Sequence, residues 1–319
     1  MSKGMRVKII GLWIVVLSLI VILSLFWNIG DMSEPLNQSI LYQVRIPKVA
    51  LALLAGIGLT IAGQLFQTLL NNPLADSFTL GLASGATFGS GLATVLGLSF
   101  VLIPLSSIAF SLITLALVLM LTTMMSRGYP SKTLILAGIM IGALFNAFLY
   151  VLIVFNQTRM NRIVNYMFGG FEAAEYNKVI YIALVLSGCL LLLALMIHKI
   201  KILQLGDLSA QALGLNVKRL SYIVLIIASV MTAVIVGYVG IIGFIGMVVP
   251  QLIRRYYRQS KLGEQMILNG LIGGSIMVLA DWLGSTVIYP IQVPASIILA
   301  LLGIPVLFYI MVTQSKTYD

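Results

Sequence analysis

Long apolar segments that recur along almost the whole chain are the feature that most constrains its fold. Of its 319 residues, 60% are hydrophobic and 9% are charged, whereas about 25% of the residues in a soluble domain are charged. A helix needs about 20 apolar residues to cross a bilayer, so the sequence predicts an all-α, polytopic membrane protein with residues 1–319 in one transmembrane domain. We place about ten spans, at 9–28, 48–70, 80–97, 102–125, 133–155, 177–197, 220–238, 241–256, 265–285 and 294–313.

The distribution of lysine and arginine predicts how these spans are oriented. With the N-terminus in the cytoplasm, most of the cations fall in cytoplasmic segments, and the outer segments hold Arg45, Lys48, Arg159, Arg162 and Lys178. Cytoplasmic loops carry such an excess, and an odd number of spans would reverse it in the second half. We therefore expect a multi-pass protein of the cell membrane with both termini in the cytoplasm. The first apolar segment is too long for a signal-peptide core, which predicts an uncleaved span.

The sequence lacks the residues that ion-coupled transport, ATP binding, disulfide formation and metal binding require. Asp281 is the one clear charge within a predicted span, and it lies near the outer end, whereas ion-coupled carriers hold ionisable groups inside the bilayer. No Gly-x-x-x-x-Gly-Lys-Ser/Thr motif is present to bind ATP phosphates. One Cys and one His predict neither a disulfide nor a metal site. A transporter of this composition needs its energy from another subunit.

Four short motifs interrupt the apolar pattern in a fixed order. They are Arg-Ile-Pro-Lys at 45–48, Asn-Pro-Leu-Ala-Asp at 72–76, Gly-Phe-Ile-Gly-x-Val-x-Pro at 243–250 and Leu-Ala-Asp at 279–281. Together with the stretches 131–147 and 203–220, they resemble the permease family of binding-protein-dependent, type II ABC importers for ferric siderophores, heme and vitamin B12. The similarity runs from about residue 45 to residue 311, and the ordered set is far more specific than any one motif.

The resemblance implies a permease subunit that is not an enzyme and binds no cofactor itself. Its implied partners are a second permease, identical or homologous, two cytoplasmic ATPase subunits that carry ATP and Mg, and an extracellular substrate-binding protein. Alternating access would then be driven by the ATPases. We expect a ferric siderophore as cargo, with heme or cobalamin as the alternative. An ion-coupled secondary transporter and an intramembrane enzyme are rival classes, against which the missing ionisable and nucleophilic residues argue.

The loop at 203–219 predicts a short cytoplasmic helix between the sixth and seventh spans. Asp207 can cap its start and Gly214 suits its end, with Leu208, Ala212, Leu213 and Leu215 forming an apolar face. From the residues alone, this face packs either on its own bundle or on a partner. The resemblance implies the coupling helix that contacts the ATPase, through Asp207, Leu208, Gln211, Ala212, Leu213 and Gly214.

Arg45 and Lys48 lie where the second span begins, on the outer side. Long cationic side chains anchor helices at the membrane interface, whereas the resemblance implies that these two dock acidic side chains of the binding protein. Ser285 stands where the vitamin B12 importer has a further arginine, so docking could also rest on Arg159, Arg162 or Lys178. Both interpretations stay open at this point.

Residues 71–76 break the second span from the third. Pro73 stops a helix, and Asn71, Asn72 and Asp76 can satisfy the freed backbone groups. The small residues that follow, Gly81, Ser84, Gly85 and Gly89 among them, predict either tight helix packing or a smooth lining for the pathway. A second glycine series ending at Gly246 predicts a closely packed turn between the seventh and eighth spans, and Gln251 makes a proton or metal role after Pro250 improbable.

The resemblance also implies which residues form a gate in the transport pathway. Ser131 and Lys132 precede the fifth span at the position where the family constricts the inner end of its pathway, although Lys132 also fits simple positive-inside labelling. Asn146, in the middle of the same span, could face the pathway or another helix. Residues 162–176 resemble the short outer helix of the family.

Overall fold

The computed structural model describes residues 3–125, 131–157 and 168–315. Every regular element within these ranges is a helix, which confirms the all-α prediction. The elements are α1 (Lys3–Phe26), α2 (Pro35–Ile40), the π-helix η1 (Leu41–Arg45), α3 (Ile46–Leu69), α4 (Leu82–Val95), α5 (Leu102–Met125), α6 (Ser131–Phe155), α8 (Tyr176–Leu203), α9 (Asp207–Ala212), α10 (Val217–Val239), α11 (Ile245–Tyr256), α12 (Leu262–Thr286) and α13 (Ala295–Ser315).

Each of the ten expected spans contains a helix. Within the described ranges, seven helical stretches are long and apolar enough to cross a membrane, and α13 holds a shorter apolar stretch, Ala295–Ile310. Helices α4 and α11 have 14 and 12 residues, about 21 and 18 Å at 1.5 Å per residue, against a hydrocarbon core about 30 Å thick. The multi-pass architecture is therefore confirmed, whereas the count of ten spans stays a prediction.

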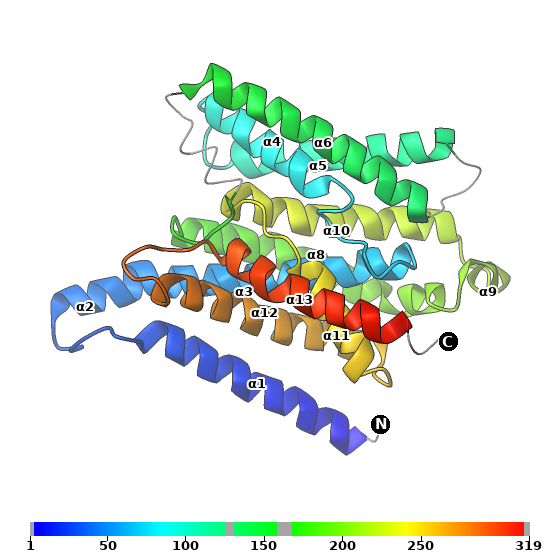
Figure 1. Ribbon diagram of the computed structural model, residues 1–319. Helices are drawn as coiled ribbons and strands as arrows, with labels where there is room; N and C mark the ends of the chain where they lie inside the picture. Colours follow the sequence, from blue (N-terminus) through cyan, green and yellow to red (C-terminus); the bar gives the residue numbers. More distant parts are fainter. Residues whose placement is uncertain (1–2, 126–130, 158–167, 316–319) are drawn as a thin grey trace.

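The helices form a bundle (Figure 1), and they differ strongly in how much of their surface is buried. Burial covers 78% of the apolar window in Pro35–Leu69, 72% in α10 and 67% in α12. By contrast, the window of α1 is 0% buried, and this helix lies at the edge of the bundle against α12. Helices α4, α5 and α6 pack together beside α10 (Figure 1). Lipid-facing sites are thus concentrated on the peripheral helices.

Glycines let the backbones of α3, α11 and α12 touch. A Cβ added to Gly63 would lie 1.9 Å from the carbonyl oxygen of Gly246, and one added to Gly56 would lie 2.4 Å from that of Gly273. Small residues at helix contacts are what membrane bundles use to pack closely. The predicted turn before Gly246 is confirmed, because α10 ends at Val239 and α11 begins at Ile245.

The small-residue segment of α4 is a packing surface. A Cβ on Gly85 would lie 1.9 Å from the Thr114 hydroxyl of α5, and one on Gly89 would lie 2.5 Å from the carbonyl oxygen of Ser106. Gly81 has a φ of +71°, and its α carbon faces Gly142 of α6. Of the two predictions for this segment, tight helix packing is confirmed.

The break between α3 and α4 satisfies its own backbone, as predicted. The Asn72 side chain accepts a hydrogen bond of 2.9 Å from the Leu74 N–H, and the Asp76 carboxylate accepts one of 2.8 Å from the Thr79 N–H. Asp76 is 3% exposed. Burial raises the pKa of its carboxyl group, and the bond from the Thr79 N–H opposes that rise.

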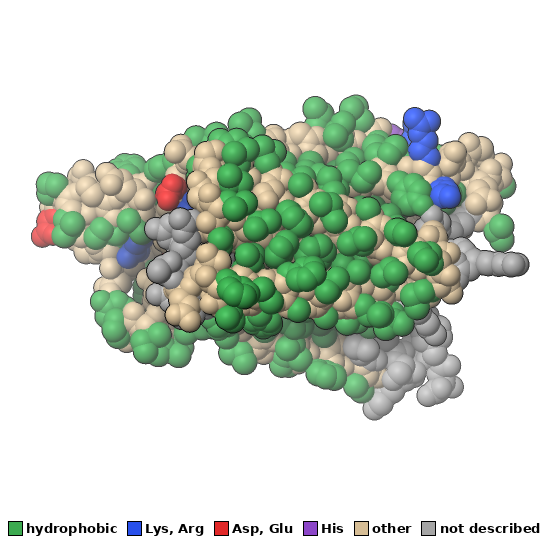
Figure 2. All heavy atoms as spheres, turned by 90° about the horizontal axis from the view of Figure 1, so that it is seen from above, with side chains coloured by type: hydrophobic (Ala, Val, Ile, Leu, Met, Phe, Trp, Pro, Cys, Tyr) green, Lys and Arg blue, Asp and Glu red, His purple; other side chains and the backbone are tan. Residues whose placement is uncertain are grey.

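The two ends of the bundle differ in charge. Both termini and α9 lie at one end, and α2 lies at the other (Figure 1). On the face in Figure 2, acidic side chains lie near the end with α2, beside a few basic ones, whereas Lys, Arg and His side chains are seen at the opposite end. Termini at one end are what an even number of spans requires.

Candidate functional site: the α9 loop and the cavity beside it

Helix α9 is a short helix of six residues at the end of the bundle that holds both termini. Gly206, with a φ of +92°, is the N-cap and Asp207 is the first helical residue, so the prediction that Asp207 caps the helix start is wrong. Gly214 has a φ of +77°, and its N–H donates to the Gln211 carbonyl oxygen at 2.9 Å. The predicted helix and its glycine end are therefore confirmed.

The apolar side chains of α9 divide between the bundle and the outside. Ala210 is 0% exposed, and Leu215 packs against the hydrophobic core. Leu208 and Leu213, in contrast, are 85% and 64% exposed. The predicted apolar face is therefore two-sided: Ala210 and Leu215 hold the segment on its own bundle, and Leu208 and Leu213 stay exposed.

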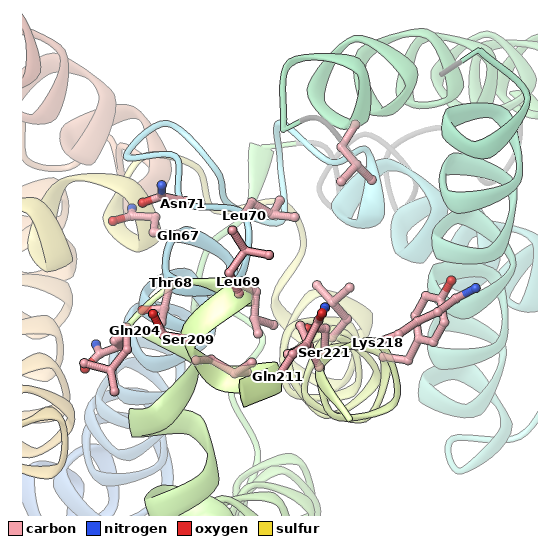
Figure 3. A pocket seen from close by; sticks show the side chains of 18 of the residues that line it. Gln67, Thr68, Leu69, Leu70, Asn71, Gln204, Ser209, Gln211, Lys218 and Ser221 are labelled. Carbon is pink, nitrogen blue, oxygen red and sulfur yellow. The ribbon is translucent and has the colours of Figure 1, made fainter. Parts of the chain in front are cut away.

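A cavity of about 900 Å³ lies between α9 and the rest of the bundle. In Figure 3, the labelled Gln67, Asn71 and Gln204 lie on one side of it and Lys218 on the other. Its walls come from the end of α3, the α8–α9 turn, the start of α10, α11 and single residues of α5 and α6. The lining residues are Gln67, Thr68, Leu69, Leu70, Asn71, Leu119, Leu134, Leu203, Gln204, Leu205, Gly206, Leu208, Ser209, Gln211, Val217, Lys218, Ser221, Tyr222, Leu225 and Arg254.

Two buried polar atoms among these lining residues have no hydrogen-bond partner. They are Nη2 of Arg254 and Oε1 of Gln67. The amide nitrogen of Gln67 is engaged, because it donates to the carbonyl oxygens of Gly246 and Met247 at 3.2 and 3.1 Å. Gln67 therefore joins α3 to the start of α11 and turns its oxygen away from that contact.

The predicted outer docking pair has partners within the chain. Lys48 Nζ lies 3.2 Å from Asp281 Oδ1, with side chains 15% and 10% exposed. Arg45 donates from Nη1 to the carbonyl oxygens of Leu25 and Trp27, at 2.9 and 2.7 Å, at the C-terminal end of α1. These contacts favour the anchoring interpretation, and docking through the pair stays a prediction.

Of the other outer candidates, the structure describes Lys178 and Ser285, and docking through the remaining ones stays a prediction. Lys178 lies 3.4 Å from Glu175, and the Ser285 hydroxyl donates to the Trp282 carbonyl oxygen in its own helix. Arg159 and Arg162 lie outside the described residues, as do residues 162–167 of the outer helix predicted at 162–176. Residues 169–175 are described and are not helical, so the prediction of a helix is wrong for that part.

The predicted gate residues are spread along α4 and α6. Ser131 and Lys132 form the first turn of α6, and their side chains are outside the described part of the chain. Asn146 is half-buried in the middle of α6. Ser84 is 4% exposed and lies beside Gly142 of α6, so it faces a helix contact within the chain. No common constriction formed by these residues is seen in the described part of the structure.

Sequence reasoning missed a buried amide network that joins α3 to α12. Asn269 Nδ2 donates to Gln64 Oε1 at 2.9 Å, and Gln64 Nε2 donates to Gln265 Oε1 at 3.4 Å. Gln251 Nε2 also donates to the Pro73 carbonyl oxygen at 2.6 Å, which ties α11 to the break after α3. The network could have been suspected from the amide side chains within apolar helices, because such a side chain needs a hydrogen-bond partner in a bilayer.

Comparison with known proteins gives the family. The model of the FecCD transport family matches residues 9–313. The chain is 32% identical to an uncharacterized ABC transporter permease protein of Bacillus subtilis, over 92% of this chain and 86% of the relative. It is 31% identical to the Fe(3+)-citrate import system permease protein of the same species, over 87% and 83%.

The fold is shared as well. A solved structure of a metal-chelate type ABC transporter in an inward-facing conformation is 27% identical and superposes with a TM-score of 0.85, covering 96% of this chain and 99% of that one. Sequence motifs, helix order and tertiary structure agree along almost the entire chain. The protein is a multi-pass membrane permease that belongs to the FecCD transport family of ABC importers.

Proposed function

We propose that this permease imports a ferric siderophore, with its energy supplied by two cytoplasmic ATPase subunits that act on α9. The observation that carries the coupling part of the proposal is the exposure of two leucines, 85% for Leu208 in the six-residue helix α9 and 64% for Leu213 at its C-cap. Fully burying a leucine side chain stabilises a contact by about 1.5–3 kcal/mol. Two such side chains at one end of a membrane bundle support a protein partner there.

The remaining parts of the importer follow from the family. A second permease, identical or homologous, encloses the pathway with this chain, and an extracellular binding protein delivers the cargo at the end that holds α2. Both termini then lie in the cytoplasm with α9, in agreement with their common end (Figure 1). Nucleotide-dependent contacts at α9 favour one access state over the other and so produce alternating access.

The cargo class is supported by the relatives. Similar proteins include an Fe(3+)-citrate import permease and a metal-chelate type transporter, and these names support an iron complex as the cargo. Heme and cobalamin are the alternative cargoes. Uptake of radiolabelled iron chelates, heme and cobalamin in cells with and without this gene distinguishes them, because only the true cargo loses its gene-dependent uptake.

A charged residue in place of an exposed leucine at the end of α9 tests the coupling role directly. In a reconstituted importer, Leu213→Glu should lower ATP hydrolysis measured without binding protein by about tenfold or more, since it places a charge in an apolar contact. Leu36→Glu is the matched control, because Leu36 is 68% exposed on the six-residue helix α2 at the opposite end. Equal hydrolysis by both variants and the parent would contradict the coupling role of α9.

The rival class has its own test. An ion-coupled carrier would accumulate its solute against a gradient when this chain alone is placed in liposomes with an ion gradient and no ATPase. We expect no uphill uptake in that assay. Uptake that requires the ATPase and stops with vanadate supports the importer instead.

A further inference from the structure

We propose that the cavity beside α9 binds the headgroup of an anionic phospholipid from the cytoplasmic leaflet. Leu208 of α9 is among the lining residues, whereas Leu213 is not, and the proposal does not depend on which cargo is carried. The site consists of Arg254 near the end of α11, Lys218 at the start of α10, and the amides and hydroxyls that line the cavity with them.

The charge of the cavity points to an anion. Lys218 and Arg254 contribute two cations, and none of the described side chains that line it is an aspartate or a glutamate. Nη2 of Arg254 is buried and has no acceptor. A buried guanidinium donor without an acceptor is unfavourable, because it has lost its hydrogen bond to water without a replacement. A phosphate oxygen placed beside it would accept that hydrogen bond and neutralise the charge, as arginine–phosphate pairs do.

The mixture of side chains fits an amphiphile better than a free ion. Besides the two cations, the lining includes the amides of Gln67, Gln204 and Gln211 and the hydroxyls of Ser209 and Ser221, which are labelled in Figure 3. These groups suit the phosphodiester and glycerol hydroxyls of a headgroup. The rest of the wall is mainly leucine, with members from α3, α5, α6, α8 and α10, and suits the first carbons of the acyl chains.

The size and position of the cavity agree with this ligand. Its volume of about 900 Å³ lies within the range of about 300–1,000 Å³ of small-molecule sites. Residues of α9 line it, and α9 lies at the end of the bundle that also holds both termini (Figure 1). Basic pockets between membrane helices on the cytoplasmic side are where anionic headgroups bind.

A headgroup in this cavity would also contact α9. Leu208, Ser209 and Gln211 of α9 line the cavity, so the same six-residue helix that faces the proposed ATPase contact also faces the ligand. We therefore expect anionic lipid to steady the helix through which force is transmitted.

Lipid binding can be measured on the full chain in phosphatidylcholine nanodiscs. The probes are spin-labelled phosphatidylglycerol and spin-labelled phosphatidylcholine, and the readout is the ratio of their association constants with the protein. Arg254→Gln and Lys218→Gln should each lower this ratio by about fivefold, the value of one cation near an anionic lipid. Lys201→Gln and Arg258→Gln are matched controls, because both residues are exposed and neither is among the described lining residues; their ratios should match that of the parent protein.

Three outcomes would overturn the proposal. One is a phosphatidylglycerol preference that survives in both Arg254→Gln and Lys218→Gln, and another is an equal loss in the two controls. The third is displacement of the spin-labelled lipid, either by millimolar inorganic phosphate or by binding of the ATPase subunits. Displacement by phosphate would assign the cavity to a free anion, and displacement by the ATPases would assign it to an acidic protein group. Lys218→Gln keeps the test decisive if Arg254→Gln fails to fold, since Lys218 is exposed at the rim.

Discussion

The ion pair between Lys48 and Asp281 should be one of the strongest single links between α3 and α12. Its atoms lie 3.2 Å apart, and the two side chains are 15% and 10% exposed. At an effective dielectric constant of about 20, their attraction is about 5 kcal/mol, and much of it is offset by the desolvation of both ions. Removing one partner is more damaging than removing both, because it leaves the other charge buried and unpaired.

This difference predicts how much unfolding free energy each variant loses. Asp281→Asn and Lys48→Met should each lower the free energy of unfolding by about 3 kcal/mol, whereas the double variant should lose less than either single variant. Lys178→Met is the control, because Lys178 pairs with Glu175, which is 62% exposed; this loss should be about 1 kcal/mol or less.

Reversible unfolding of the purified chain by SDS titration in mixed micelles measures these differences, with helical circular dichroism as the signal. The double-mutant cycle gives the coupling energy of the pair directly. If the loss in the double variant equals the sum of the two single losses, the two charges are uncoupled and the reasoning from the structure is refuted.

Two further predictions concern packing around α11. Gly63→Ala should destabilise the protein by about 3 kcal/mol or more, since its Cβ would lie 1.9 Å from the Gly246 carbonyl oxygen, whereas Gly188→Ala, with no neighbour within 4 Å, should change the SDS midpoint little; equal midpoints for the two variants would contradict this. Gln251→Ala should cost about 1–2 kcal/mol in the same titration by removing the 2.6 Å bond to the Pro73 carbonyl oxygen, and a loss within error of zero would show that the contact contributes nothing.

Much of the fold could be predicted because its causes are local. The apolar segments determine helices in a bilayer, where each backbone group must be satisfied within its own segment. The turn at Asn72 and Asp76 and the end of α9 at Gly214 follow from residues within a few positions of one another. For the same reason the short helix α9 could be placed before its structure was known.

The sequence alone determined that this is a membrane protein built from helices, and its ordered motifs indicated the family. Only the tertiary structure decided which faces meet: that Lys48 pairs with Asp281, that Gly63 touches Gly246, and that Arg254 lines a cavity beside α9. The reason is that lipid tails and protein interiors are equally apolar. A leucine that faces lipid therefore looks the same in the sequence as one that packs against a helix, and the partners of the few polar groups are set by contacts far apart along the chain.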